Sequence, residues 1–179
     1  MSTISMIMAG FGGQGILFSG KFFAHKGLIE DKYLSWLPSY GPEMRGGTAN
    51  CSVILSDTDI GSPIVNNPDC LMAMNLPSLD KFEAAVVKGG KIFIDSSLVE
   101  RKCERDDVEV FYIPATQMAK EEGIATLANM IIVGHLLENH PELSFDGAEN
   151  VVEKLVPPKK AALKELNMKA LSLGKNYNK

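Results

Sequence analysis

Apolar residues along this chain gather in short runs that alternate with longer segments of helical periodicity. A run of about four to eight apolar or β-branched residues between turn signals is typical of a buried strand, whereas apolar residues recurring every three or four positions are typical of an amphipathic helix. Strands are predicted over residues 4–9, 33–37, 48–55, 70–74, 91–94 and 108–113. Helices are predicted over residues 14–30, 79–88, 116–122 and 125–139, followed by two more that start near Ser144 and are separated at Pro157-Pro158.

This alternation predicts one α/β domain over residues 1–179, with a helical C-terminal extension from about residue 144. The 48–55 strand follows the 33–37 strand without an intervening helix, so these two strands are expected to be antiparallel. We therefore predict a three-layer α/β/α fold around a mixed, mostly parallel, Rossmann-like sheet. Gly20 and Gly27 weaken the first helix, and we expect them where it packs closely against its neighbours.

The composition excludes several classes of protein. The chain has 18 basic and 22 acidic residues and a net charge of −4, whereas a nucleic-acid-binding protein usually has a clear basic excess. No apolar run approaches the roughly 18 residues of a membrane-spanning helix, and the N-terminus lacks the pattern of a signal peptide. We therefore expect a cytoplasmic protein that binds neither nucleic acid nor membrane.

No residue of the chain shows the spacing of a metal ligand or a catalytic group. Cys51, Cys70 and Cys103 are widely spaced and form no Cys-x-x-Cys pair. They are expected to be free thiols in a reducing compartment, and not ligands of zinc or of an iron–sulfur cluster. The three histidines form no ligand pattern with them, no serine lies in a nucleophile elbow, and no paired carboxylates stand out. We predict neither a metal site nor a catalytic residue in this chain.

A glycine-rich segment, Gly10-Phe11-Gly12-Gly13-Gln14-Gly15, fits the pattern Gly-x-Gly-x-x-Gly between the first predicted strand and the first predicted helix. In that context glycines permit a tight turn, and the free N–H groups at the start of the helix favour a phosphate or a carboxylate. We predict that Gly10, Gly12, Gly13, Gln14 and Gly15 form such an anion-binding turn. The alternative is a tight strand–helix turn that binds no ligand.

A dinucleotide-dependent dehydrogenase requires a further residue besides the glycine-rich turn. It needs an acidic residue at the end of the second strand to hold the ribose hydroxyls. Here that strand leads into Pro38-Ser39-Tyr40, and the nearest acidic residues, Asp31 and Glu43, flank it in the wrong places. This weakens the dehydrogenase interpretation, which stays an alternative, as does a non-enzymatic module that binds a small anion.

The loop from Ser39 to Gly47 is rich in proline and glycine, so its sequence restricts its backbone. It contains Tyr40, Glu43 and Arg45, and an arginine suits bidentate contact with a carboxylate or a phosphate. Because this loop and the glycine turn follow the first two strands, we expect both at the same edge of the sheet. The alternative is an elaborate hairpin connection in which Arg45 pairs with Glu43.

The two motifs in order, Gly-Phe-Gly-Gly-Gln-Gly and then Ser-Tyr-Gly-Pro-Glu-Met-Arg-Gly-Gly, resemble the gamma subunit of 2-oxoacid:ferredoxin (or acceptor) oxidoreductases. The same domain occurs fused in the pyruvate and ketoisovalerate members. The resemblance extends over nearly the whole chain, from about residue 4 into the tail, and includes Asn129 and the regions of Pro77 and Asp95. The sequence of the second motif is most similar to those of the 2-oxoglutarate and branched-chain members.

The resemblance implies a subunit of a complex that converts a 2-oxoacid and coenzyme A (CoA) to acyl-CoA and CO2 while it reduces ferredoxin or another acceptor. Thiamine diphosphate and iron–sulfur clusters lie in other subunits of that family. The expected partners are therefore alpha and beta subunits and a ferredoxin-like subunit or domain, and the chain alone is expected to be inactive and to self-associate.

The resemblance implies that the gamma-type domain packs over the active site and is associated with CoA as cosubstrate. Because CoA brings phosphate groups that suit a glycine-rich helix start and an arginine, we expect it at the glycine turn. Tyr40, Glu43 and Arg45 would then form the facing wall at the subunit junction, and Ser39 is a further candidate contact with CoA.

Overall fold

The computed structural model describes residues 2–40 and 48–178. The strands are β1 (Thr3–Phe11), β2 (Tyr33–Tyr40), β3 (Thr48–Ser56), β4 (Cys70–Ala73), β5 (Lys91–Asp95) and β6 (Glu109–Ile113). The helices are α1 (Ile16–Ile29), α2 (Leu76–Phe82), α3 (Ala115–Glu121), α4 (Ala128–Asn139), α5 (Ala148–Leu155) and α6 (Ala161–Lys175). Short 3-10 helices cover Glu83–Ala85, Ala125–Leu127 and Pro158–Lys160. Each predicted strand and helix has a counterpart among these elements.

The strands form one sheet in the order β2-β3-β1-β4-β5-β6. Strands β1, β4, β5 and β6 are parallel, whereas β3 runs antiparallel to both β2 and β1. The prediction of a mixed, mostly parallel sheet is confirmed. The antiparallel part of the sheet includes the β2–β3 pair. This pairing was expected because no helix lies between these two strands in the sequence.

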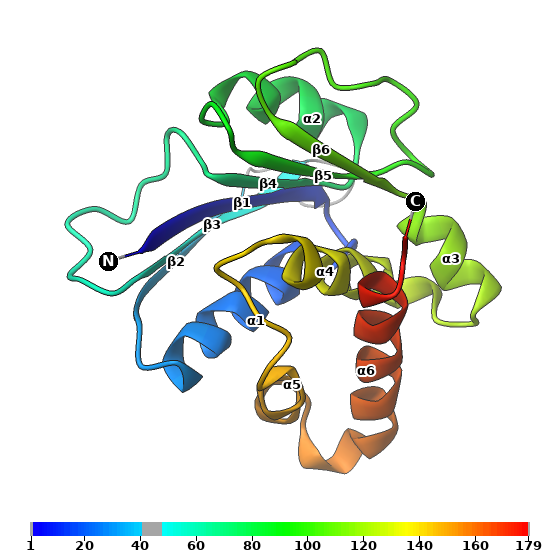
Figure 1. Cartoon of the computed structure of the whole chain (residues 1–179). Coiled ribbons are helices and arrows are strands. Elements are labelled where there is room, and N and C mark those ends of the chain that lie inside the picture. The colour runs from blue at the N-terminus through cyan, green and yellow to red at the C-terminus, as the bar shows by residue number, and fades with distance from the viewer. Residues whose placement is uncertain (1, 41–47, 179) are drawn as a thin grey trace.

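Helices cover the two faces of the sheet unequally (Figure 1). Helix α2 packs on one face against a small apolar cluster that includes Ile7, Leu71 and Ile92. On the other face, α1, α4 and α6 enclose a larger core, which includes Phe22 and Met130. The three-layer α/β/α architecture is confirmed, with most of the buried apolar side chains on one side of the sheet.

Helix α1 lies very close to the strands beneath it, as Gly20 and Gly27 predict. A Cβ on Gly20 would lie 2.7 Å from Trp36 Nε1, and a Cβ on Gly27 would lie 2.6 Å from Leu55 Cδ2. Larger residues at these two positions would push the helix away from β2 and β3.

Two helix boundaries differ from the prediction. Helix α5 begins at Ala148, and not near Ser144, because Gly147 precedes it with φ of 73°, a left-handed conformation that glycine adopts at little cost. Helix α2 begins at Leu76, earlier than predicted, because Asn75 Oδ1 accepts a hydrogen bond from the Ser78 N–H at 2.8 Å and caps the first turn. It ends at Phe82, and a 3-10 turn follows in place of the predicted last part.

His135 fixes the end of α6 against α4. The side chain is buried, its Nδ1 lies 3.1 Å from the Gly174 carbonyl oxygen, and its ring is edge-on to Phe93, Phe111 and Tyr177. Burial lowers the pKa of His135 below its ordinary value of 6.5, and the Gly174 carbonyl opposes this shift. The neutral imidazole is therefore the form that the fold favours.

We expect the free energy of unfolding to decrease as the pH falls below about 6.5. The unfolded chain then binds a proton at His135 that the folded chain does not, so the stability present above this pH is lost as the pH falls toward the lowered pKa. Urea unfolding between about pH 5 and pH 8 measures the effect. His135→Phe should flatten the dependence in part, because burial also lowers the pKa of His140. An unchanged pH profile in that variant would contradict the assignment.

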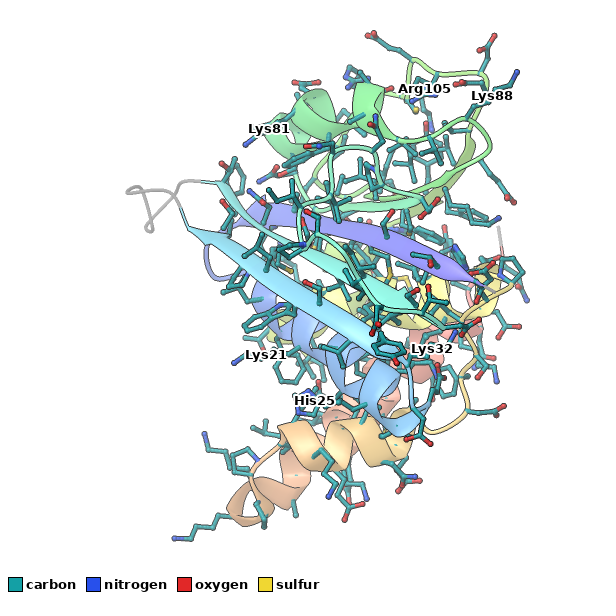
Figure 2. The ribbon with its side chains drawn as sticks, turned by 90° about the vertical axis from the view of Figure 1, so that its left-hand side faces the viewer. Lys21, His25, Lys32, Lys81, Lys88 and Arg105 are labelled. Atoms are coloured by element: carbon teal, nitrogen blue, oxygen red, sulfur yellow. The ribbon has the colours of Figure 1, made fainter. Side chains whose placement is uncertain are left out.

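The basic side chains labelled in Figure 2 lie in two separate regions of the molecule. Figure 2 shows Lys81, Lys88 and Arg105 at the end of the molecule that carries α2, and Lys21, His25 and Lys32 on the side of α1. These labelled groups do not gather into one patch. No helix in the described ranges combines the length and the apolar composition that crossing a bilayer requires.

Candidate functional site

The glycine turn between β1 and α1 contains positions that favour glycine for two different reasons. Gly13 and Gly15 have φ of 92° and 75°, in the region that favours glycine. Gly10 is needed for a different reason, because a Cβ there would lie 2.7 Å from Ile16 Cδ1 and 3.1 Å from Met74 Cβ. The turn therefore has a defined backbone shape, and Gly12 and Gly13 lie exposed on its outer side.

Gln14 ties the turn to the neighbouring strand. Its Oε1 accepts a hydrogen bond from the Phe11 N–H at 2.6 Å, and its Nε2 donates to the Met74 carbonyl oxygen at 3.2 Å. Its own N–H donates to the Phe11 carbonyl oxygen at 3.2 Å. Gln14 thus supports the turn, and the backbone donors that remain for a ligand are those of the glycines.

Three backbone N–H groups of the turn lie where α1 begins. The N–H groups of Gly12, Gly13 and Gly15 have no hydrogen-bond acceptor within residues 2–40 and 48–178. Gly15 is the N-cap of α1, where no side chain caps the helix and no acidic residue lies in the first turn. Since the start of a helix carries partial positive charge, this arrangement can bind a phosphate or a carboxylate through the backbone alone.

The turn lies where successive crossovers change from one face of the sheet to the other. Strand β1 leads to α1 on one face, whereas the adjacent parallel strand β4 leads to α2 on the opposite face (Figure 1). In open α/β sheets, the crevice between two such strand ends is the usual place for a ligand. On the β4 side, Asn75 and Ser78 are buried, and Asn75 Nδ2 and Ser78 Oγ have no hydrogen-bond partner among the described residues. This position favours a ligand site at the turn.

The other predicted site residues belong to the β2–β3 connection. Glu43 and Arg45 lie outside the described residues, so their roles stay predictions. Ser39 is exposed near the end of β2, and Tyr40 pairs in register with Ala49, which also pairs with Gly10. Both ends of the 41–47 segment and the glycine turn therefore lie at the same edge of the sheet, as predicted. Strand β3 separates Tyr40 from Gly10 by about 10 Å, or two strand spacings.

The strand order also bears on the dehydrogenase alternative. In a dinucleotide site, the acidic residue that holds the ribose ends a strand near the glycine turn. Here the neighbour of β1 on that side is the antiparallel β3, which begins at this edge with Thr48. Asp31 precedes β2 and so lies at the opposite edge. The described strand ends around the turn therefore offer no carboxylate in the required place.

Asn129 on α4 fixes the start of α1, and sequence reasoning did not single it out as a site residue. Its Nδ2 donates to the Gly15 carbonyl oxygen and to Ser19 Oγ, each at 3.1 Å. A Cβ on Gly15 would lie 2.6 Å from the same nitrogen. No local pattern could have revealed this contact, because Gly15 and Asn129 are 114 positions apart.

The polar groups at the end of β5 support α3. Asp95 is fully buried and accepts hydrogen bonds from the Ser97 N–H at 3.0 Å and from Thr116 Oγ1 at 2.5 Å. Ser97 Oγ in turn accepts from the Gln117 N–H at 3.0 Å. These bonds satisfy the orphan donors at the start of α3, so the group has a structural role.

The three cysteines are free, and their places do not fit a cluster site. Cys51 and Cys70 are buried in the core and Cys103 is partly buried. Burial raises the pKa of the Cys51 thiol to about 12 and also raises the pKa of Cys70, so both are protonated thiols in this fold. Among the residues that the structure describes, no group of three or more His, Cys, Asp or Glu side chains could hold a metal ion.

Exposed apolar side chains lie at the same edge as the turn. Phe11 ends β1, and Leu76 and Leu98 lie three positions beyond the ends of β4 and β5; they are 38%, 39% and 42% exposed. Apolar side chains around a polar crevice are typical of a surface that another protein covers. We call these three residues the edge set.

Comparison with known proteins agrees with the motifs. Residues 5–177 match the family model described as pyruvate ferredoxin/flavodoxin oxidoreductase. The ketoisovalerate oxidoreductase subunit VorA of Methanothermobacter marburgensis is 40% identical over 130 residues, which cover 73% of this chain and 27% of VorA. The 2-oxoglutarate synthase subunit KorC of the same organism is 35% identical over 175 residues, which cover 94% of this chain and 92% of KorC. The chain thus spans about a quarter of the length of VorA and nearly all of KorC.

Two solved structures share the fold. The gamma subunit of keto/oxoacid ferredoxin oxidoreductase from Geobacter sulfurreducens has a TM-score of 0.84 and 30% identity, and the match covers 97% of this chain and 95% of that one. The 2-oxoglutarate:ferredoxin oxidoreductase from Magnetococcus marinus, solved with 2-oxoglutarate, coenzyme A and succinyl-CoA, has a TM-score of 0.88 and 23% identity. That match covers 98% of this chain and 31% of the longer one, so it shows the same fold inside a larger chain.

Proposed function

The chain belongs to the pyruvate ferredoxin/flavodoxin oxidoreductase family, and from this premise we propose that it is the gamma subunit of a 2-oxoacid:ferredoxin oxidoreductase. The family resemblance that the two motifs indicate is thereby confirmed. In the proposed complex, a 2-oxoacid and CoA are converted to acyl-CoA and CO2, and the electrons reduce ferredoxin or another acceptor. In this proposal, the acid–base and electron-transfer groups of the reaction belong to the partner subunits.

The backbone N–H groups of Gly12, Gly13 and Gly15, which have no acceptor among the described residues, support the proposal that this chain helps to bind CoA. CoA contains phosphate groups, and the start of α1 offers N–H donors, a favourable dipole and a first turn without an acidic residue. The Magnetococcus marinus enzyme, which has the same fold within its chain, binds CoA. Across β3, Ser39, Tyr40, Glu43 and Arg45 are proposed to form the facing wall.

The role of this chain in the reaction is then to position CoA. Thiamine diphosphate, when bound in a partner subunit, supplies the decarboxylation chemistry, and clusters in partner subunits carry the electrons. The glycine turn would hold the phosphates of CoA so that its thiol meets the acyl group in one orientation. Holding two reactants in a defined geometry can lower a barrier by several kcal/mol without any proton transfer by this chain.

We further propose that the edge set is covered by a partner subunit and that this chain thereby closes the active site. In the assembled complex, Phe11, Leu76 and Leu98 would be buried beside the glycine turn. An isolated subunit, in which these side chains stay exposed, would then be expected to self-associate, since obligate interfaces resemble a core cut in half.

A charge placed in the edge set is expected to prevent assembly. In Leu76→Glu and Leu98→Glu chains, a carboxylate would have to be desolvated against an apolar surface, which costs several kcal/mol. Tagged variants isolated anaerobically should recover less than about a tenth of the thiamine-diphosphate-binding subunit and of the acyl-CoA-forming activity that the unaltered chain recovers. Leu28→Glu is the matched control, because Leu28 is also exposed but lies at the far end of α1 from the turn.

Two outcomes separate the parts of the proposal. If the unaltered chain recovers no thiamine-diphosphate-binding subunit, it is not a subunit of such a complex. If the complex forms with Leu76→Glu and Leu98→Glu as well as with Leu28→Glu, the edge set is not the covered surface.

A further inference from the structure

A cavity of about 270 Å³ lies at the edge of the sheet opposite the glycine turn. Strands β1, β4 and β5 are parallel, and the cavity is lined by the first residues of β1 and by residues at or before the start of β4 and β5. The residues that follow α4 also line it. The glycine turn begins at the other end of β1, and none of its residues lines the cavity. A ligand in this cavity would therefore occupy a site separate from the proposed CoA site.

Ionisable side chains of both signs line the cavity, namely those of Asp69, Lys88, Lys91, His140 and Glu142. Lys91 forms an ion pair with Glu109. The side chains of Asp69, Lys88 and Glu142 form no ion pair within residues 2–40 and 48–178. The cavity thus offers two carboxylates and one ammonium group that can each bind a ligand group of opposite charge.

Asp69 has one carboxylate oxygen available for a ligand. Its Oδ2 accepts hydrogen bonds from the Ser5 N–H at 2.8 Å and from Ser5 Oγ at 2.6 Å. Its Oδ1 accepts none from the described residues and is not buried. Helix α4 ends at this cavity, and no basic residue lies in its last turn. Because the C-terminus of a helix carries partial negative charge, this side of the cavity favours a cationic group.

His140 supplies a hydrogen-bond donor to the same cavity. The side chain is 8% exposed, and its Nδ1 accepts a hydrogen bond from the Glu142 N–H at 3.3 Å, so the neutral ring carries its proton on Nε2. Burial lowers the pKa of His140 below its ordinary value of 6.5, and the carboxylate of Glu142 opposes this shift. Nε2 has no partner within the described residues and is not buried. The Nε2–H group is therefore available to an oxygen atom of a ligand.

We propose that this cavity binds a small α-amino acid. The ammonium group of the ligand binds Asp69 Oδ1 beside the end of α4, and its carboxylate binds Lys88 Nζ and accepts a hydrogen bond from His140 Nε2. A cavity of about 270 Å³ is below the range of roughly 300–1,000 Å³ typical of drug-sized ligands, so it suits a small molecule. Among the described residues, no group of His, Cys, Asp and Glu side chains converges on a metal ion, so the expected cationic group is organic.

This inference goes beyond the proposed function and does not depend on it. A 2-oxoacid has the carboxylate of the amino acid with the same carbon skeleton, but an oxo group replaces the ammonium group. The contact with Asp69 therefore distinguishes the amino acid from the 2-oxoacid.

Isothermal titration calorimetry of this chain tests the inference, with L-glutamate and L-valine as probes and 2-oxoglutarate and ketoisovalerate as their controls. We expect at least one amino acid to bind with a Kd of about 1 mM or tighter, and its 2-oxoacid not to bind. Asp69→Asn keeps an acceptor for Ser5 and removes the charge, so it should weaken binding roughly 10- to 100-fold.

Lys88→Gln should weaken binding only a few-fold, because Lys88 is exposed. Lys120→Gln is the matched control, since Lys120 is also exposed, forms no ion pair within the described residues and lies outside the cavity. Its Kd should equal that of the unaltered chain.

The other results overturn the inference and leave the proposed function untouched, because complex formation is measured separately. If neither amino acid binds, the cavity is not an amino-acid site. Equal binding of an amino acid and its 2-oxoacid would show that no ammonium group is recognised. If Asp69→Asn and Lys88→Gln both bind the amino acid as tightly as the unaltered chain, the ligand lies elsewhere on the molecule. If Asp69→Asn does not fold, an unchanged Kd in Lys88→Gln is sufficient to reject the site.

Discussion

Gly174→Ala is expected to destabilise the folded chain by about 3 kcal/mol, the upper part of the range for overpacked cores. A Cβ on Gly174 would overlap the carbonyl oxygen of Ile131 on α4, and a Cβ on Gly134 would overlap the carbonyl oxygen of Leu171 on α6. The obstructing atoms are backbone, so no side-chain rotation relieves the clash, and α6 has to move away from α4. Such a movement would also break the contact between His135 and the Gly174 carbonyl oxygen.

The sign of the change in the free energy of unfolding distinguishes this prediction from the usual effect of the substitution. In an exposed helix, glycine to alanine stabilises by about 1 kcal/mol, because alanine has the higher helix propensity. Urea unfolding of Gly174→Ala therefore distinguishes a close helix contact from an open one, and Ser172→Ala on the exposed side of α6 serves as the control. Gly134→Ala should destabilise by a similar amount. The double variant should lose less stability than the two single variants lose together, since one displacement of α6 relieves both clashes. Stabilisation by either single substitution would refute the close contact.

The secondary structure could be predicted because its signals are local. Strand runs and helical periods each depend on a few consecutive residues, and the lack of a helix between β2 and β3 predicted the antiparallel pair. Boundaries were less accurate where a single cap decides them. Ser144 has the residue type of an N-cap, but the left-handed conformation of Gly147 sets the start of α5. The capping of α2 by Asn75 had a usable signal, since an asparagine followed by a proline in the first turn is typical of a helix start.

The parts of the fold that escaped prediction depend on residues far apart in the chain. Gly134 and Gly174 each look unfavourable in a helix, and only the packing of α4 on α6 shows why glycine is there. His135 has no sequence signal for burial, because the aromatic rings around it come from β5, β6 and the residues after α6.

The candidate site likewise has some features with a local sequence signal and others that depend on tertiary packing. The glycine turn could be located because its motif, its strand and its helix are consecutive. Its position at the crevice between β1 and β4 required the order of the strands. The contact of Asn129 with the start of α1 could not be found, since it forms only when α4 packs beside α1.

Gly13→Asp is expected to weaken CoA binding by roughly 30- to 100-fold. Gly13 is exposed, and a Cβ built there meets no atom within 4 Å, so a side chain adds no clash. The aspartate would place a carboxylate beside the donors that are proposed to hold the phosphates of CoA. At about 6 Å and an effective dielectric constant near 20, repulsion between two unit charges is about 2 to 3 kcal/mol.

Gly13→Asn separates charge from backbone strain. Asparagine and aspartate have the same shape, and both tolerate positive φ better than other residues, so the strain at φ of 92° is similar in the two variants. KM for CoA in the purified complex should therefore rise steeply in Gly13→Asp and only a few-fold in Gly13→Asn. The difference should shrink at high ionic strength, because salt screens the repulsion between exposed charges. Equal weakening in both variants would mean that only the shape of the turn matters, and no weakening in either would remove the glycine turn from the CoA site. A large, salt-sensitive difference would leave the backbone donors of the turn as the groups that bind the phosphates.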